Sequence, residues 1–193
     1  MLENIDPVEK LHGLARSKAR TYETQTVHPR LVDEYLANGW IVDKQIQSKV
    51  KVKREKDHGT LLEDRVWTLL YRMGFSHLCR AGGAILSIND KDPSGPKTKI
   101  DVVGIDNEIA VAFECKSSQE LAKRLQFQEE LGKHSLIRQA FAKAINDQYP
   151  CEYKRQPVLA MFLDNVLLSD NDRERAKLAN VVIFDSQDLK YYP

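Results

Sequence analysis

Residues 99–116 read K-I-D-V-V-G-I-D-N-E-I-A-V-A-F-E-C-K. In the middle of this stretch, Asp106-Asn107 is a pair typical of a two-residue turn between antiparallel strands. The flanking runs, 99–105 and 108–116, are rich in β-branched and other apolar residues, which favours strands. The stretch therefore predicts a β-hairpin, and a turn at Asp106-Asn107 places Asp101 opposite Ala112.

The two faces of this expected hairpin differ in character, because side chains alternate between faces along a strand. One face carries Asp101, Glu114 and Lys116. On the same face, Ala110 and Ala112 are small enough to leave room for a ligand. The opposite face is apolar and holds Ile100, Val102, Ile109, Val111, Phe113 and Cys115. We expect this apolar face, with the side chain of Cys115, to pack in the core.

Two carboxylates and a lysine on one face suit a divalent metal site. Hard cations such as Mg²⁺ bind oxygen ligands and keep several waters, so Asp101, Glu114 and the backbone carbonyl of Cys115 would suffice. Mn²⁺ is the expected substitute for Mg²⁺. Such an ion polarises a phosphodiester and lowers the pKa of a bound water. Lys116 would orient or deprotonate that water, or neutralise charge on the phosphate. The alternative is an exposed charged face without a ligand.

The rest of the chain alternates helical and strand patterns. A helix is expected over 61–73, with Thr60 as its N-cap, because apolar residues recur there at helical spacing before Gly74. After the hairpin come a helical pattern over 119–147 interrupted near Gly132, a strand over 157–163, a helix over 170–178 and a strand over 181–184. This order predicts an α/β fold, a mixed central sheet flanked by helices, over 58–193. Residues 1–57 are expected to form a small accessory region, with a short helix over 29–38 and basic strands within 40–53.

These residues resemble a known family. Asp101 followed by Glu114-Cys115-Lys116 is similar to the D…(D/E)-x-K signature of the PD-(D/E)XK nucleases, although Ile100 stands where the family name has proline. The helix from Leu62-Glu63 to Met73-Gly74-Phe75 resembles the first helix of Mrr-like members, whose glutamate Glu63 matches. Gln139 matches a glutamine that some members carry in the following helix. Over residues 60–189, the resemblance implies a restriction-endonuclease-like fold with a four-stranded mixed core sheet and Mg²⁺-dependent hydrolysis of DNA phosphodiesters.

Two of these catalytic candidates have a structural alternative. Thr60-x-x-Glu63 is the pattern of a capping box, in which Glu63 would bond to a backbone N–H and need no catalytic role. Gln139 is also explained as a polar surface residue of a helix. The predicted catalytic set is therefore Asp101, Glu114 and Lys116, with Glu63 and Gln139 as additional candidates.

Basic residues are concentrated between residues 44 and 56, although the whole chain carries 29 Lys and Arg against 28 Asp and Glu. A nucleic acid would favour this segment, because each phosphate contact releases counterions. Candidate nucleic-acid-binding residues are Lys49, Lys51, Lys53 and Arg54. The alternative is a solvated strand edge whose lysines prevent aggregation.

Cysteine spacing and hydropathy exclude several classes of protein. Cys79, Cys115 and Cys151 show no clustered spacing, so neither a disulfide framework nor a zinc site is indicated. The first residues do not resemble a signal peptide, and no apolar run is long enough to span a bilayer. We therefore expect a cytoplasmic protein without a membrane partner.

A second, narrower resemblance concerns the first third of the chain. The segments V-H-P at 27–29, G-W at 39–40 and L-L-E-D-R-V-W at 61–67 resemble the N-terminal region of larger bacterial proteins. Those proteins continue into a DGQHR domain, related to the DndB family of DNA phosphorothioation systems. Since no D-G-Q-H-R occurs here, the likeness implies a nuclease-like domain whose C-terminal companion lies outside this chain.

Two functions are therefore expected from the sequence. The first is a Mg²⁺-dependent DNA endonuclease in bacterial DNA defence or modification-linked restriction. The second is a DNA-binding module with a nuclease fold and little or no cleavage activity. Carboxylates that face phosphates are of no use to a protein that only binds DNA, which favours the endonuclease. A homodimer is compatible with either function.

Overall fold

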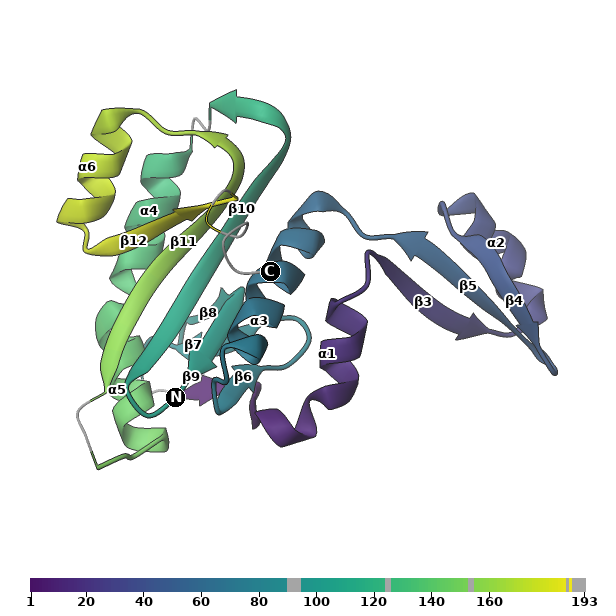
Figure 1. The fold of residues 1–193 in the computed structure, drawn as a ribbon, viewed down its shortest axis with the longest axis horizontal. Coiled ribbons are helices and arrows are strands. Elements are labelled where there is room, and N and C mark those ends of the chain that lie inside the picture. The colour runs from purple at the N-terminus through teal and green to yellow at the C-terminus, as the bar shows by residue number, and fades with distance from the viewer. Residues whose placement is uncertain (90–94, 124–125, 153–154, 187, 189–193) are drawn as a thin grey trace.

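A six-stranded sheet lies at the centre of the computed structural model, which describes residues 1–89, 95–123, 126–152, 155–186 and 188 (Figure 1). The strand order is β12 (Val181–Asp185), β11 (Gln156–Leu167), β10 (Ile109–Lys123), β9 (Val102–Ile105), β6 (His77–Cys79) and β2 (Ile5–Pro7). β10, β11 and β12 are parallel, and the remaining neighbours pair antiparallel. The expected α/β fold with a mixed central sheet is confirmed, with six strands where the family resemblance implied four.

Helices cover both faces of this sheet. α3 (His58–Arg72) packs on one face, while α4 (Phe127–Leu136), α5 (Arg138–Gln148) and α6 (Asp170–Leu178) lie on the other (Figure 1). Gly104 in β9 allows the close approach of α3, because a Cβ there would lie 2.8 Å from Leu70 Cδ1 and 2.9 Å from Phe75 Cδ1. Burial on both sides explains why β11 carries an uninterrupted apolar run, Leu159–Leu163.

The start of α3 differs from the expectation. The helix begins at His58, and its N-cap is Asp57, whose carboxylate accepts hydrogen bonds from the backbone N–H and the hydroxyl of Thr60, both at 2.8 Å. The prediction of Thr60 as N-cap was wrong, because the helix begins two residues before Thr60 and the Asp57 side chain caps the N–H of Thr60 itself. Glu63 is therefore not the distal residue of a capping box that starts at Thr60.

The helical pattern expected over 119–147 was wrong at its beginning. Residues 119–123 continue β10, which pairs with β11 again at Ala122 and Lys123 after an irregularity that follows Ser117. Pairing with a neighbouring strand overrides the helical propensity of this Q-E-L-A-K segment. The break between the two helices that follow lies at Ile137 rather than near Gly132.

The hairpin forms with a shifted register. Ala112 pairs with Val103, so the turn lies one residue later than predicted and Asp101 comes level with Glu114 rather than with Ala112. The cause is the side chain of Asp106, whose Oδ1 accepts hydrogen bonds from the N–H groups of Glu108 and Ile109, both at 2.8 Å. A shift of the pairing by two residues leaves every side chain on its predicted face.

The first arm of the hairpin is divided between two sheets. β8 (Lys97–Ile100) pairs with β7 (Ala84–Ser87), which also pairs with β1 (Leu2–Glu3), whereas β9 belongs to the central sheet. The chain changes sheets at Asp101. Gly83 makes this crossing possible: it has a φ of +85°, and a Cβ there would lie 2.4 Å from the carbonyl oxygen of Ile100.

A third sheet, which we call the small sheet, projects from the main body (Figure 1). Its strands are β3 (Tyr22–Val27), β5 (Lys49–Glu55) and β4 (Ile41–Ile46), with β5 in the centre. η2 (Pro29–Leu31) and α2 (Val32–Ala37) connect β3 to β4, and a small core forms from Val27, Trp40, Val50 and Val52 with Val32 and Tyr35. The expected helix and basic strands of the N-terminal region are confirmed.

The segments before this small sheet belong partly to the main body. β1 and β2 pair with β7 and β6, and η1 (Val8–Lys10) and α1 (His12–Lys18) follow them. The division of the chain at residue 57 stays a prediction. Within the described ranges, none of the helices combines the length and the apolar character needed to cross a membrane.

Candidate active site

Asp101 lies at the crossing between β8 and β9, with only 13% of its side chain exposed. Its Oδ2 accepts a hydrogen bond from the backbone N–H of Cys115 at 2.9 Å, and its Oδ1 lies 3.3 Å from Lys99 Nζ. The bond to Cys115 attaches the carboxylate to β10 directly beside Glu114. Asp101 therefore lies next to Glu114, as predicted, although the register differs.

Glu114 and Lys116 lie on the same face of β10, and their side chains form an ion pair of 2.5 Å between Oε1 and Nζ. Burial and then the charge of Asp101 raise the pKa of Glu114 above its ordinary value. Burial alone would lower the pKa of Lys116, but the hydrogen bond to Glu114 and the surrounding carboxylates raise it. Lys116 is thus held as a cation, which fits the neutralisation of phosphate charge better than the deprotonation of water.

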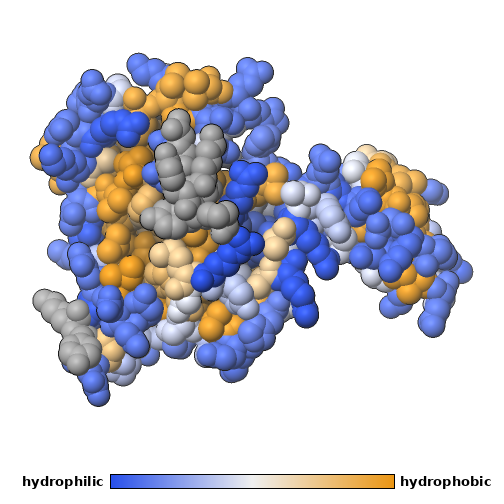
Figure 2. Space-filling view, in the orientation of Figure 1, coloured by the Kyte–Doolittle hydropathy of each residue, from blue (hydrophilic) through white to orange (hydrophobic). Residues whose placement is uncertain are grey.

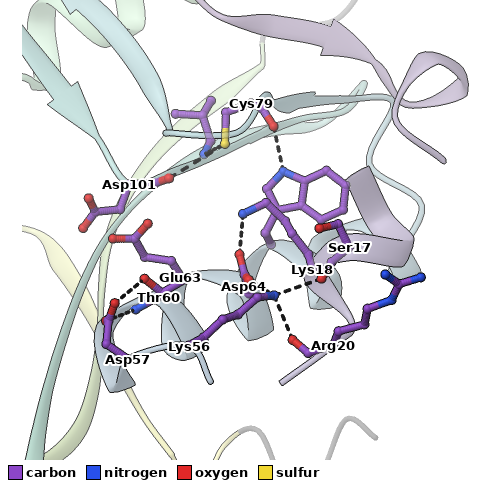
Figure 3. A network of polar contacts seen from close by, with 12 residues as sticks. Ser17, Lys18, Arg20, Lys56, Asp57, Thr60, Glu63, Asp64, Cys79 and Asp101 are labelled. Atoms are coloured by element: carbon purple, nitrogen blue, oxygen red, sulfur yellow. Dashed lines mark hydrogen bonds and ion pairs between the residues drawn. The ribbon is translucent and has the colours of Figure 1, made fainter. Parts of the chain in front are cut away.

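Glu63 extends from α3 toward Asp101, and Figure 3 shows the two carboxylates facing each other. The side chain of Glu63 is 30% exposed. Burial first, and then the charge of Asp101, raise the pKa of Glu63. Because Asp57 caps the helix, the capping alternative does not account for Glu63. The structure places Glu63 beside Asp101, and its catalytic role stays a prediction.

Lys99 also lies among these carboxylates, although a role for it was not predicted from the sequence. Its Nζ lies 3.3 Å from Asp101 Oδ1 and 3.9 Å from Glu63 Oε1. Burial acts to lower the pKa of Lys99, but the charges of Asp101 and Glu63 outweigh it and raise the pKa. The signal was present in the sequence, since strand alternation places Lys99 on the same face as Asp101. We call these five residues the acid–lysine cluster: Glu63, Lys99, Asp101, Glu114 and Lys116.

A pocket of about 290 Å³ opens beside the acid–lysine cluster. Its lining combines strand residues with residues of α4 and the residue after it: Thr98, Lys99, Glu114, Lys116, Glu130, Lys133, His134 and Ile137. His134 is buried, burial lowers its pKa, and its Nε2 has no hydrogen-bond partner among the described residues. The pocket residues that α4 contributes were not predicted from the sequence, because their position depends on how α4 packs on the sheet.

Three other predictions about the site are answered by burial. Ala110 and Ala112 are fully buried, so the expectation that they leave room for a ligand was wrong: helices fill the space above them. The side chain of Cys115 is buried as expected, and burial raises its pKa well above the ordinary value. Gln139 is exposed on α5 and does not line the pocket. Its predicted catalytic role has no support from its position.

The carboxylates of the acid–lysine cluster suit only some kinds of metal ion. In the part of the chain that the structure describes, no three His, Cys, Asp or Glu side chains converge closely enough to hold an ion by themselves. Asp101 and Glu114 with a backbone carbonyl fit a hard cation that keeps most of its water, such as Mg²⁺. The raised pKa values of Glu63 and Glu114 indicate a site where a further positive charge would be favourable.

The basic segment lies on the small sheet. Lys51 and Lys53 extend toward Asp43, at 3.6 and 3.3 Å, and Lys49 is exposed. Arg54 points to the opposite face, where it pairs with Glu23 at 2.6 Å and lies over the ring of Trp40. The alternative of a protected strand edge was wrong for the lysines of β5, which is the central strand, whereas Lys44 lies on the edge strand β4.

No family model and no curated protein matches the chain. Protein VC1899 from Vibrio cholerae is similar at 14% identity with a TM-score of 0.40, over 96% of this chain and 48% of that one. Can2 from Sulfobacillus thermosulfidooxidans, solved with cyclic tetra-adenylate, is similar at 12% identity with a TM-score of 0.41, over 98% and 56%. The chain thus spans about half the length of each. Values this low decide neither its fold nor its chemistry.

Proposed function

We propose that this protein is a metal-dependent deoxyribonuclease that hydrolyses phosphodiester bonds at the acid–lysine cluster. One observation carries the proposal: Asp101, at the β8–β9 crossing, lies between Glu63 of α3 and Glu114 of β10. Two lysines, Lys99 and Lys116, pair with these carboxylates and line a pocket. The substrate class comes from the resemblance to PD-(D/E)XK nucleases, as does a role in bacterial DNA defence or restriction.

The electrostatics of the cluster argue against a purely structural role. Burial and then the charge of Asp101 raise the pKa of both Glu63 and Glu114, so Asp101 repels each of these carboxylates. A fold gains nothing from such repulsion, whereas a site for a divalent cation requires it. Asp101, Glu114 and the backbone carbonyl of Cys115 would hold Mg²⁺ or Mn²⁺. When bound, the ion would polarise the phosphodiester and lower the pKa of a water molecule.

The protein's own residues divide the remaining work. Lys116, kept positively charged by Glu114, would neutralise the charge that develops on the phosphate. Glu63, whose raised pKa makes it a stronger base than an exposed glutamate, would accept a proton from the attacking water. Gln139 has no part in this scheme.

The small sheet offers a second contact with DNA. Lys44, Lys49, Lys51 and Lys53 lie on the face that α2 leaves open, beside Ile41 and Ile46. Figure 2 shows hydrophilic and apolar side chains side by side on this projecting part. Asp43 offsets part of the charge, so we expect modest, salt-sensitive contacts with phosphates rather than base-specific ones.

The test is incubation of the purified protein with supercoiled, linear and modified DNA, with Mg²⁺, Mn²⁺ or EDTA. We expect cleavage that requires a divalent ion and is lost in Glu114→Gln and in Lys116→Ala. The matched control is Glu120→Gln, which removes an exposed carboxylate from the same strand. Cleavage that persists at the wild-type rate in Glu114→Gln would refute the proposed site.

The second candidate is a DNA-binding module with little or no cleavage activity, which the lysines on the open face of the small sheet favour. Binding of DNA by the wild type without cleavage under any of these metal conditions would establish it. Substitution of Lys49, Lys51 and Lys53 by glutamine would then weaken binding equally for all DNA sequences.

A further inference from the structure

Lys99 occupies a distinctive place in the acid–lysine cluster. Its ammonium lies between two carboxylates from different elements, Asp101 at 3.3 Å and Glu63 at 3.9 Å. It is also one of the residues that line the pocket. The other lysine of the cluster, Lys116, is already bound to Glu114 at 2.5 Å. Lys99 is therefore the counter-ion of the two remaining carboxylates.

The contacts of Lys99 are looser than those of Lys116. Its two N–O distances exceed the 2.5 Å of the Lys116–Glu114 pair, and 48% of its side chain is exposed, against 21% for Lys116. An ammonium on a flexible four-carbon stem at this exposure can leave its partners without unfolding any element. Asp101 itself is held in place independently of Lys99, by the N–H of Cys115.

We propose that Lys99 is an internal counter-ion that a divalent cation displaces from Asp101 and Glu63. This inference rests on the proposed metal-dependent function and deepens it. Without metal, the ammonium offsets the repulsion between the carboxylates. When the cation binds, the ammonium swings toward the pocket, where its charge is available to a phosphate of the substrate. Lys99 thus lowers the affinity of the site for the divalent cation.

The measurement is calorimetric titration of the whole chain with MnCl₂ in the absence of DNA, so that the readout is binding and not activity. Lys99→Gln should bind Mn²⁺ about tenfold more tightly than the wild type, because the cation no longer competes with a positive charge a few ångströms away. Lys99→Arg keeps the charge and should bind with wild-type affinity. Lys97→Gln is the matched control: it lies on the same strand, but its ammonium pairs with Glu3 at 2.9 Å, so its removal should change the affinity less than about twofold.

Two results would overturn the inference. If Lys99→Gln binds Mn²⁺ with equal or lower affinity than the wild type, Lys99 supports the carboxylates and does not compete with the ion. If Lys97→Gln tightens binding as much as Lys99→Gln, the effect is one of overall charge. Both results leave the metal site intact, whereas a wild type and variants that all fail to bind Mn²⁺ would remove the proposed function along with this inference. Unchanged thermal unfolding of metal-free Lys99→Gln, within a few degrees, confirms that the variant is folded.

Discussion

Glu63 and Asp64 are adjacent residues of α3, yet they belong to two different groups of charges. Figure 3 shows Glu63 turned toward Asp101, and Asp64 turned toward Lys18 and Lys56. Asp64 binds Lys18 at 2.5 Å and Lys56 at 2.6 Å, and Lys56 also donates to the carbonyls of Ser17 and Arg20. We call Asp64, Lys18 and Lys56 the Asp64 joint, and each of these three side chains is at most 12% exposed.

The two groups differ in how their charges are balanced. The Asp64 joint has two ammonium groups for one carboxylate, and its hydrogen bonds connect α1, α3 and the end of β5. The acid–lysine cluster has three carboxylates for two ammonium groups, and it opens into a pocket. A closed, buried group of hydrogen-bonded charges holds the fold together, whereas an open group with surplus negative charge suits the proposed cation.

The largest effect on stability is expected at the joint. Asp64→Asn leaves two buried ammonium groups without their carboxylate, which should lower the free energy of unfolding by about 3–5 kcal/mol. Glu63→Gln, at the next position of the same helix, should cost less than about 1 kcal/mol because its ion pair is long and partly exposed. Urea denaturation of both variants measures the difference. Equal losses would show that the two groups do not differ in kind.

The largest effect on catalysis is expected in the acid–lysine cluster. Glu114→Gln should reduce the rate of DNA cleavage on the order of 10²- to 10³-fold, since it removes a proposed metal ligand and the partner of Lys116. Thermal unfolding should stay close to that of the wild type. Gel-based cleavage rates and a melting curve measure the two quantities, with Glu120→Gln as the control. A variant that unfolds early and cuts poorly would indicate a structural glutamate instead.

A divalent ion should stabilise the protein through the acid–lysine cluster alone. At a concentration one hundred times Kd, Mn²⁺ should add about 2.7 kcal/mol to the free energy of unfolding. The gain should vanish in Asp101→Asn and persist in Lys97→Gln. Denaturant titrations with Mn²⁺ and with EDTA measure it. A gain of the same size in Asp101→Asn would place the ion elsewhere.

A smaller effect is expected from pH in the absence of metal. The pKa values of Glu63 and Glu114 are raised in the folded state, so the folded protein holds protons that the unfolded chain releases. Their contribution to stability is complete below the ordinary glutamate value of 4.5 and is lost as the pH rises through the folded pKa values. Glu63→Gln should therefore lose less stability than the wild type above pH 4.5. Parallel stability profiles for the two proteins would contradict this.

The central part of the site could be predicted from the sequence, because strand alternation decides which side chains share a face even when the turn is misplaced. The turn was misplaced by one residue, which shifts the pairing by two and keeps Asp101, Glu114 and Lys116 on one face. The Asp106 side chain, which sets the true turn, gives a signal that a residue pair alone does not contain.

The rest of the site depends on long-range packing. Lys133 and His134 reach the pocket only because α4 ends where it does, and the misplaced break near Gly132 hid this. Residues 119–123 are strand because β11 lies beside them, which their own propensities do not reveal. Lys99 was overlooked because lysines are common on exposed strands, and only its distances to Asp101 and Glu63 set it apart.

The most direct test of the central claim is a crystal of the protein soaked in Mn²⁺, with the ion located by its anomalous scattering. The account predicts a single peak within coordination distance of the carboxylates of Asp101 and Glu114, with the ammonium of Lys99 withdrawn from Asp101. A Mn²⁺ ion bound elsewhere would contradict this account. A site that stays free of Mn²⁺, with Lys99 still between Asp101 and Glu63, would contradict it as well.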